Sequence, residues 1–274
     1  MKFLTSSIRS LPNFIIIGSP KSGTTSLFNY LIQHPDIVGI TRKEPHFFNI
    51  SYSKNLNWYK MYFPTKSQLI SNKITGEATP SYFIDPFVPK RIFSVLPDIK
   101  LILLLRNPID RSFSHYKHSF KDGFENLSFE NAIAAEEKRL ENYENDLKIK
   151  STNGNESFLE YVKKLSQYHP PNLYLFSYLK TSIYAEHLLN WLNVFQKKQI
   201  LILNADEFFV EPDKIYQQVL NFLGVRNYDL LKYEKFNFGD KNKINPDIRR
   251  HLIEFFKPHN EKLFNILGTR FDWN

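Results

Sequence analysis

The stretch Asn13-Phe-Ile-Ile-Ile-Gly-Ser-Pro-Lys-Ser-Gly-Thr-Thr25 decides the fold. Its first five residues, 13–17, are an apolar run rich in β-branched side chains, which is the pattern of a buried parallel strand. A loop of Gly, Ser, Pro and Lys follows, and from Thr24 to about Gln33 the apolar residues recur at helical spacing. A strand, a loop and a helix in this order place successive backbone N–H groups at the start of the helix. The stretch therefore predicts an anion-binding loop.

The loop carries the residue types that such a site needs. Gly23 allows the backbone to approach an oxyanion closely, Lys21 supplies a positive charge, and Thr24 and Thr25 add hydroxyl donors. In the Walker A pattern the lysine directly follows the second glycine, whereas Lys21 stands two residues before Gly23, so the match is partial. A turn that caps a helix is the alternative interpretation, and the position after an isoleucine-rich strand favours the anion loop.

The rest of the chain continues the alternation of strands and helices. We expect further strands at 37–40, 101–105 and 200–203, a helix starting near Ile109, and helices over 127–150, 183–195, 212–223 and 246–267. Residues 151–155 read as a loop, and the irregular region 120–180 as a possible insertion over the site. This order predicts an α/β fold with a P-loop-like central parallel sheet flanked by helices on both faces. We expect one domain over residues 1–274.

Composition narrows the possible partners and compartments. The formal net charge of +8 favours anionic ligands, and 25 Phe and 15 Tyr provide a large aromatic core. The sequence contains no Cys, which excludes disulfides, thiolate metal ligands and a cysteine nucleophile. Residues 1–11 contain no apolar run typical of a signal peptide, and no stretch approaches the roughly 18 apolar residues of a membrane span. We therefore expect a cytoplasmic protein without an integral membrane segment.

A second motif follows the apolar run 101–105. A kinase or nucleoside triphosphatase often holds Mg²⁺ through an acidic residue at the end of such a strand, but here the run ends in Arg106. A guanidinium suits bidentate binding of a phosphate, and Ser114 on the following helix is placed to donate to the same group. An ordinary arginine at a helix entry and a solvent-facing serine are the alternatives.

Together these motifs resemble PAPS-dependent sulfotransferases, which use 3′-phosphoadenosine-5′-phosphosulfate as sulfuryl donor. Pro20–Leu27 resembles their 5′-phosphosulfate loop, and Leu105–Ser114 resembles their 3′-phosphate motif. The blocks at 44–48, 76–83, 184–191 and 267–273 are similar to the heparan sulfate N- and 3-O-sulfotransferase branch. The resemblance implies that the nucleotide is bound by Lys21, Ser22, Gly23, Thr24, Thr25, Ser26, Arg106 and Ser114.

The resemblance also implies a mechanism without a metal ion. Sulfuryl transfer would proceed by in-line displacement, with Lys21 stabilising the leaving group of the product PAP (adenosine 3′,5′-bisphosphate) and Glu44 acting as general base. A surface glutamate paired with Lys43 or Arg42 is the alternative for Glu44. His118 matches a position with a functional histidine in the N-sulfotransferases, and a surface histidine is the alternative. We expect His46 to pack or form hydrogen bonds beneath the site.

Three departures from the branch concern the acceptor more than the donor. Ala78 stands where the branch carries a lysine, and the loop at 238–243 lacks the usual Lys-Gly-Arg. Lys241 and Lys243 are candidate substitutes that would close over the nucleotide phosphates, and a solvated basic loop is the alternative. The disulfide that vertebrate 3-O enzymes carry near this loop has no counterpart here.

The acceptor stays open at this point. A glycan fits the resemblance and the basic charge, while other sugar-containing molecules, a small alcohol and an amine remain alternatives. A P-loop kinase or NTPase is the runner-up function, against which Arg106 argues. A nucleic-acid-binding module is third, because Lys and Arg are dispersed and no known nucleic-acid-binding motif appears.

Overall fold

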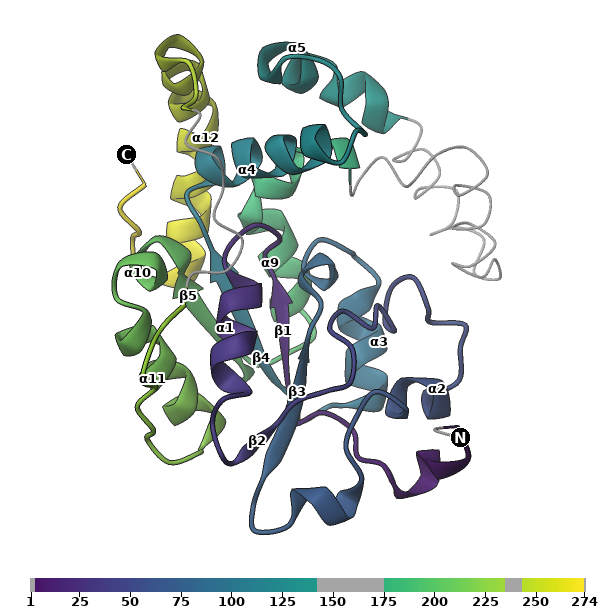
Figure 1. Ribbon diagram of the computed structural model, residues 1–274. Coiled ribbons are helices and arrows are strands. Elements are labelled where there is room, and N and C mark those ends of the chain that lie inside the picture. Colours follow the sequence, from purple (N-terminus) through teal and green to yellow (C-terminus); the bar gives the residue numbers. More distant parts are fainter. Residues whose placement is uncertain (1–2, 142–174, 235–242, 274) are drawn as a thin grey trace. The chain divides into compact units, whose positions relative to one another are not determined.

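The computed structural model describes residues 3–141, 175–234 and 243–273 of the chain (Figure 1). By its contacts the chain divides into two compact units. The first combines Met1–Arg106 with Leu189–Phe238, and the second combines Asn107–Leu188 with Gly239–Asn274. Each unit therefore joins two segments that lie far apart in the sequence. One domain over residues 1–274 stays a prediction.

Within the described residues, the first unit contains a five-stranded sheet of order β2-β3-β1-β4-β5, with all pairings parallel. The carboxyl ends of all its strands therefore lie at one edge, which is where parallel sheets of this kind bind ligands. The strands are β1 (Phe14–Gly18), β2 (Ile37–Val38), β3 (Ile74–Ala78), β4 (Lys100–Leu105) and β5 (Ile200–Asn204).

One face of this sheet packs against α1 (Thr24–Leu31) and α11 (Pro212–Leu223), which stand beside each other in Figure 1. Side chains alternate along a strand, so every second residue of β1 and β4 points to these helices. The apolar stripes of α1 and α11 meet them in one core. That core includes Phe14, Ile16, Leu27, Leu31, Ile102, Leu104, Leu203, Tyr216 and Leu220.

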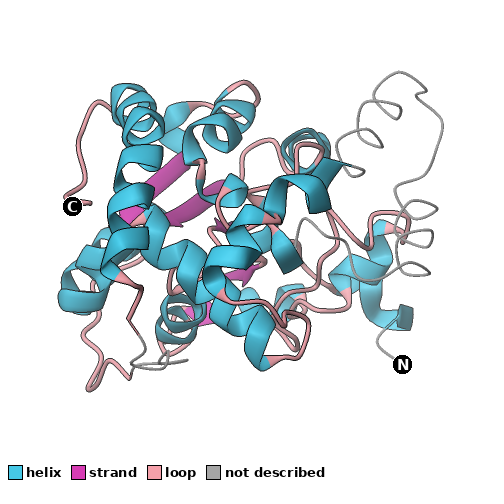
Figure 2. Cartoon of the chain, turned by 90° about the horizontal axis from the view of Figure 1, so that it is seen from above, coloured by secondary structure: helices cyan, strands magenta, loops and turns pink. Residues whose placement is uncertain are grey.

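The opposite face of the sheet is buried as well. Ile15 and Ile17 on β1 are fully buried although they point away from α1. Trp191 of α9 (Tyr184–Leu192) is fully buried, and its Nε1 donates to the carbonyl oxygen of Phe83 at 3.0 Å. Burial on both faces explains the continuous apolar runs of β1 and β4. Figure 2 shows the strands between helices, so the predicted α/β fold is confirmed.

The second unit is helical in its described residues. It contains α4 (Pro108–Lys121), α5 (Phe129–Ala134) and α12 (Pro246–Leu267). The Asn107 side chain caps α4 by accepting from the N–H of Ile109 at 3.0 Å, and Asn245 caps α12 in the same way. An apolar cluster joins the three helices and comprises Ile109, Phe129, Leu252 and Phe256.

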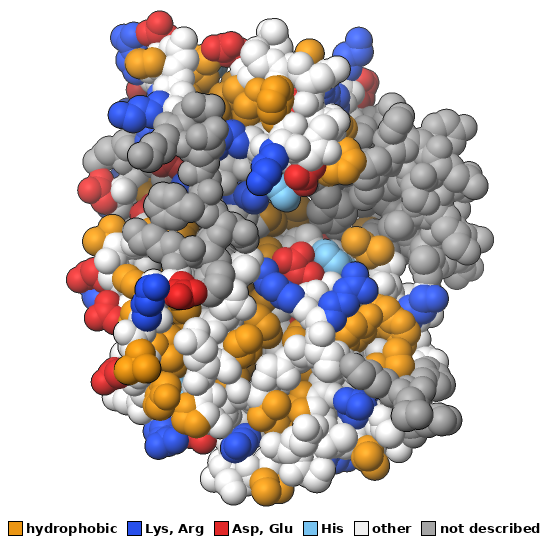
Figure 3. Space-filling view, in the orientation of Figure 1, with side chains coloured by type: hydrophobic (Ala, Val, Ile, Leu, Met, Phe, Trp, Pro, Cys, Tyr) orange, Lys and Arg blue, Asp and Glu red, His pale blue; other side chains and the backbone are white. Residues whose placement is uncertain are grey.

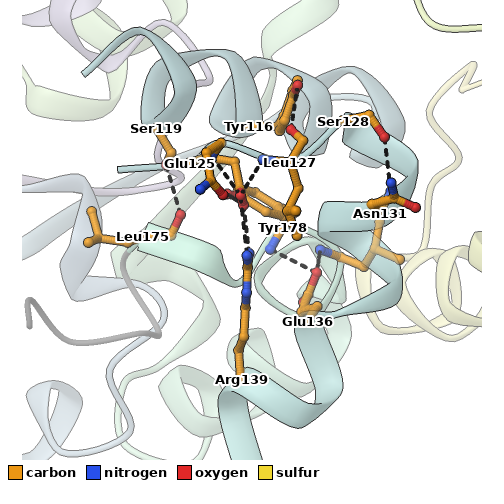
Figure 4. A network of polar contacts seen from close by, with 12 residues as sticks. Tyr116, Ser119, Glu125, Leu127, Ser128, Asn131, Glu136, Arg139, Leu175 and Tyr178 are labelled. Atoms are coloured by element: carbon orange, nitrogen blue, oxygen red, sulfur yellow. Dashed lines mark hydrogen bonds and ion pairs between the residues drawn. The ribbon is translucent and has the colours of Figure 1, made fainter. Parts of the chain in front are cut away.

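A buried polar network in the second unit holds the segment 178–182 (Figure 4). The Glu136 carboxylate accepts backbone N–H groups of Tyr178, Leu179 and Lys180 at 2.8–3.0 Å. Glu125 pairs with Arg139 through contacts of 2.6 and 3.2 Å and also accepts the Tyr178 hydroxyl at 2.8 Å. We call these charged residues, together with a fully buried arginine described next, the anchor cluster: Arg111, Glu125, Glu136 and Arg139.

Arg111 holds the same segment from α4. Its Nη2 donates to the carbonyl oxygen of Tyr178 and to the hydroxyl of Thr181, both at 2.7 Å. Its Nε donates to the hydroxyl of Ser182 at 2.6 Å, and the side chain is fully buried. Nε and Nη2 of the guanidinium thus exchange water for protein acceptors, as a buried charge requires.

Most expected elements are present, with four corrections. The strand expected at 37–40 ends at Val38, and β3 was not predicted as a strand. The short helices α2 (Leu56–Lys60), α3 (Val88–Val95) and α10 (Ala205–Val210) were also missed. The long helix expected over 127–150 breaks after α5 and resumes at 136–141. Its remainder and the loop 151–155 lie outside the described residues.

The helices expected over 212–223 and 246–267 are confirmed with those bounds as α11 and α12. None of the helices among the described residues combines the length and the apolar character that crossing a membrane requires.

Candidate active site

The loop between β1 and α1, residues 18–25, has the geometry of an anion cradle, and we call it the anion loop. Gly23, the residue before α1, has φ of 84°, in the left-handed region that favours glycine. A Cβ atom at Gly23 would lie 2.8 Å from Cε1 of Phe209, too close for any other residue to fit without movement. The first N–H groups of α1 lack carbonyl partners within the helix and form its positive end. The predicted strand, loop and helix are confirmed.

Hydroxyl groups fix the anion loop to the neighbouring strand. Ser19 Oγ lies 2.7 Å from Oγ of Ser22 and donates to the carbonyl oxygen of Leu104 on β4 at 3.0 Å. Ser22 is fully buried, and Ser26 is nearly so. The predicted ligands Lys21 and Thr25 are half-buried, so their side chains are accessible at the loop surface.

Arg106 lies against the anion loop, as the order of the sheet predicts. Its Nη1 donates to the carbonyl oxygen of Lys21 at 3.1 Å. Its guanidinium carbon lies 5.3 Å from the centroid of the Phe209 ring, within the range of a cation–π contact. The structure therefore brings two of the predicted cations, Lys21 and Arg106, to the carboxyl ends of β1 and β4.

Four further predicted residues lie in the second unit. Ser114 is half-buried on α4, and His118 follows one turn later on the same face of that helix, with a side chain that is 55% exposed. His118 Nδ1 lies 3.5 Å from a carboxylate oxygen of Asp122. Lys243 is exposed just before α12, and Lys241 lies outside the described residues. The roles of these four residues stay predictions.

A second polar group in the first unit contains the predicted general base. Glu44 Oε1 lies 3.1 Å from Nζ of Lys43, and Glu44 Oε2 lies 3.5 Å from Nε2 of His46. Lys43 Nζ also donates to Oγ1 of Thr25 in the anion loop. Figure 3 shows basic, acidic and histidine side chains adjoining one another near the middle of the visible face. The pairing of Glu44 with Lys43 that the sequence left as an alternative does form, and it places the carboxylate beside the anion loop.

The backbone at these positions adopts unusual conformations. Lys21, Glu44 and His46 have φ of 69°, 55° and 52°, in the left-handed region that costs non-glycine residues energy. The other non-glycine residues with positive φ among the described part of the chain are Ser71 and Asn72, which are neighbours. Such conformations concentrate at functional sites. We call Lys21, Lys43, Glu44 and His46 the site cluster.

The charge state of Glu44 depends on its two partners. Burial alone raises the pKa of its carboxyl group, but the hydrogen bond from His46 and the charge of Lys43 outweigh that effect, so the pKa lies below its usual value. Glu44 is therefore ionised at neutral pH and able to accept a proton. His46 forms a further contact of 3.3 Å with the Ser81 hydroxyl, in line with the expectation that it forms hydrogen bonds at the site.

A buried carboxylate lies under this cluster. Glu77 on β3 is fully buried and accepts hydroxyl groups from Tyr59 at 2.6 Å, Thr79 at 2.5 Å and Tyr82 at 3.3 Å. Burial raises the pKa of Glu77 to about 7, because its hydroxyl donors are neutral and only partly offset the loss of hydration. The hydroxyl oxygen of Tyr82 also accepts the N–H of Phe48, so the network supports the segment that follows Glu44.

Three residues of functional interest were not predicted. Lys43 was weighed only as a partner of Glu44, because its contact with Thr25 spans 18 residues and leaves no local pattern. Phe209 follows β5, and inspection of residues after every strand would have found it. Glu77 carries no pattern that distinguishes a buried carboxylate from an exposed one. Ala78, in place of a lysine, is fully buried in the core of the first unit.

The donors of the first unit fit an anionic nucleotide. Backbone N–H groups, hydroxyls, an ammonium and a guanidinium are the groups that bind phosphate and sulfate oxygens. The anion loop offers the first three, and Arg106 lies beside it as a second cationic site. The direct contact of Arg106 with the backbone of Lys21 makes the two sites suitable for two anionic groups of one molecule.

Comparison with known proteins agrees with this chemistry. Residues 11–273 match the family model described as "Sulfotransferase domain". The chain is 32% identical to the membrane-associated sulfotransferase kil1 of Dictyostelium discoideum, over 96% of this chain and 66% of that protein. It is 29% identical to human heparan sulfate glucosamine 3-O-sulfotransferase 3B1, over 99% of this chain and 67% of that protein. The chain thus spans about two thirds of the length of these relatives.

A solved structure shows a similar fold. The crystal structure of a sulfotransferase from Alicyclobacillus acidocaldarius superposes with a TM-score of 0.74 at 28% identity, over 96% of this chain and 98% of that one. Sequence motifs, fold and relatives agree, and the resemblance inferred from the sequence is confirmed. The chain belongs to the sulfotransferase family, near the heparan sulfate branch.

Proposed function

We propose that this enzyme transfers the sulfuryl group from PAPS to a hydroxyl or amine of a glycan or another sugar-containing acceptor. The observation that carries this proposal is the contact of Arg106 with the backbone of the anion loop. It places a guanidinium, and not a carboxylate that would hold Mg²⁺, at the end of the strand next to β1. The kinase alternative is therefore not favoured.

The donor would be held at two points. The N–H groups at the start of α1, with Lys21, Ser22, Gly23, Thr24, Thr25 and Ser26, would bind its 5′ end. Arg106 would bind the 3′-phosphate, and Ser114 is kept as the further ligand of that group that the sequence predicts. When bound, PAPS supplies the sulfuryl group, which passes from the bridging oxygen of the nucleotide to the acceptor. Lys241 and Lys243 are kept as the candidate phosphate ligands that the sequence predicts.

The chain's own groups provide the proton acceptor and the charge stabilisation. Glu44 takes the proton from the attacking hydroxyl or amine, for which its ionised carboxylate is suited. The ammonium of Lys21 stabilises the negative charge that develops on the departing oxygen. His118, exposed on α4, is proposed as a second acid–base group. These groups accept the proton and stabilise the developing negative charge. We therefore propose that the reaction needs no metal ion.

A glycan acceptor is supported by two observations. The human relative acts on heparan sulfate glucosamine, as its name states, and it aligns with 99% of this chain. The net charge of +8 also suits an anionic polysaccharide.

A transfer assay tests the proposal. The enzyme would be incubated with ³⁵S-labelled PAPS and separately with heparan sulfate, N-desulfated heparan sulfate, neutral sugars and simple alcohols, each with and without EDTA. We expect label on at least one carbohydrate, unaffected by EDTA. Label on simple alcohols alone would contradict the glycan acceptor, and loss of transfer in EDTA would contradict the metal-free mechanism.

A further inference from the structure

Lys43 connects the anion loop with Glu44, which follows in a different segment of the chain. Its Nζ donates to Oγ1 of Thr25, the second residue of α1, and lies 3.1 Å from Oε1 of Glu44. Its side chain is 25% exposed, so these contacts are partly shielded from water. The proposed function assigns no role to this lysine.

The position of this ammonium is unfavourable for the helix by itself. The start of α1 is the positive end of its dipole, and a cation placed there is destabilising unless a negative charge lies nearby. Glu44 provides that charge from the loop after β2. A carboxylate beside an anion-binding loop would in turn repel an anionic ligand, and the intervening cation reduces this repulsion.

We propose that Lys43 is a positioning residue for sulfuryl transfer, whose ammonium holds the carboxylate of Glu44 at a fixed place beside the anion loop through the hydroxyl of Thr25. This inference rests on the proposed function, in which Glu44 accepts the proton and the anion loop holds the donor. It adds the physical link by which the base and the donor keep their relative placement.

Electrostatics give the link a measurable signature. Within the described part of the chain, the charged or titratable groups that contact Glu44 are Lys43 and His46, and Glu77 on β3 interacts with His46 in turn. Burial raises the pKa of the Glu44 carboxyl, while His46 and Lys43 lower it by more. Removal of the Lys43 charge should therefore raise this pKa and leave Glu44 protonated at higher pH. A lysine without this contact to Glu44 would not produce that change.

The experiment compares Lys43→Met, Lys43→Arg and Arg42→Met with the unmodified protein. Arg42 is an exposed cation next to Lys43 and serves as the matched control. The titration midpoint of the Glu44 carboxyl would be followed by ¹³C NMR of glutamate-labelled protein, with Glu44→Gln to assign the signal. The rate of transfer from PAPS to heparan sulfate would be measured over pH 5–9, and the binding of PAP by calorimetry.

We expect the midpoint of Glu44 to move to higher pH in Lys43→Met and to return towards its original value in Lys43→Arg. The acidic limb of the rate profile should move in the same direction, with kcat lower by about tenfold to a hundredfold. Arg42→Met should change neither. An unmoved midpoint in correctly folded Lys43→Met overturns the inference alone. Failure of the unmodified protein to bind PAP overturns the proposed function and the inference with it.

Discussion

Two clusters of charged side chains in this protein differ in burial, hydrogen bonding and backbone conformation. The anchor cluster of the second unit is mostly buried and densely hydrogen-bonded, with bonds of 2.6–3.2 Å to backbone, hydroxyl and carboxylate groups. Figure 4 shows the part of it around Glu125, Glu136 and Arg139. The site cluster of the first unit is half-exposed, has left-handed backbone at three positions, and pairs its charges at 3.1–3.5 Å. Satisfied buried groups cannot rearrange without large cost, whereas the site cluster is accessible to a ligand. The comparison indicates that one cluster maintains the fold and the other performs chemistry.

Substitution of Glu44 should have the largest effect on catalysis and almost none on folding. Glu44→Gln removes the proton acceptor while it keeps the size of the side chain, so we expect kcat to fall by about 10²- to 10⁴-fold. The free energy of unfolding, measured in urea, should change by less than about 0.5 kcal/mol. A large loss of stability with little loss of kcat would show that Glu44 maintains the fold, as the anchor cluster does. It would contradict the division between a structural and a catalytic cluster.

The reverse result is expected for Arg111. Arg111→Met removes one buried donor from the Tyr178 carbonyl and from the hydroxyls of Thr181 and Ser182, while Ser112 still donates to that carbonyl. Breaking such a buried network should lower the free energy of unfolding by about 3–5 kcal/mol. The matched control is Arg250→Met, which removes an exposed ion pair with Asp247 on α12 and should cost less than about 0.5 kcal/mol. Equal losses in the two variants would contradict the role of burial.

The elements that depend on neighbouring residues could be predicted from the sequence alone. The stretch 13–25 predicts β1, the anion loop and the start of α1, because each of those structures depends on neighbouring residues. The same local pattern finds α11 and α12. Arg106 was predicted at the site because it ends the apolar run 101–105, where a kinase would carry an acidic residue, and the contact with Lys21 agrees with that placement.

The missed features depend on contacts between distant residues. β3 contains Gly76 and Glu77, which give no strand pattern. Gly76 is there because a Cβ atom would lie 2.5 Å from the Phe14 ring, and Glu77 is covered by Tyr59 and Tyr82. Neither fact can be read from residues 74–78. The cytoplasmic location and the roles of Ser114, His118, Lys241 and Lys243 stay predictions.

Glu77 combines properties of the two clusters and allows a further test. It is buried like the anchor cluster, but its hydrogen-bond donors are neutral hydroxyl groups. A pKa raised from 4.5 to about 7 means that the folded state prefers the protonated form. Stability from this group is therefore fully present below about pH 4.5 and is lost as pH rises through about 7, by about 3 kcal/mol. Unfolding in urea at pH 5 and pH 8 should show this loss in the unmodified protein and not in Glu77→Gln. Parallel pH dependence in both proteins would contradict the raised pKa.

The smallest expected effect concerns the contact between Phe209 and Arg106. Phe209→Ala removes a partly exposed cation–π contact and should weaken the binding of PAP by about threefold to tenfold. The binding of AMP, which lacks the 3′-phosphate, should change less. Val210→Ala, at a neighbouring residue that is 80% exposed, is the control. Equal losses for PAP and AMP would show that the ring acts on the loop or the nucleoside and not through Arg106.

The proposed PAPS site is tested most directly by calorimetry, which would measure the binding of PAP and of ATP with Mg²⁺ to the unmodified protein and to Arg106→Ala. We predict that PAP binds without a metal ion, that it binds more tightly than ATP with Mg²⁺, and that the substitution weakens PAP binding by at least about tenfold. A preference for ATP with Mg²⁺ that Arg106→Ala leaves unchanged would contradict the PAPS site and support the kinase alternative.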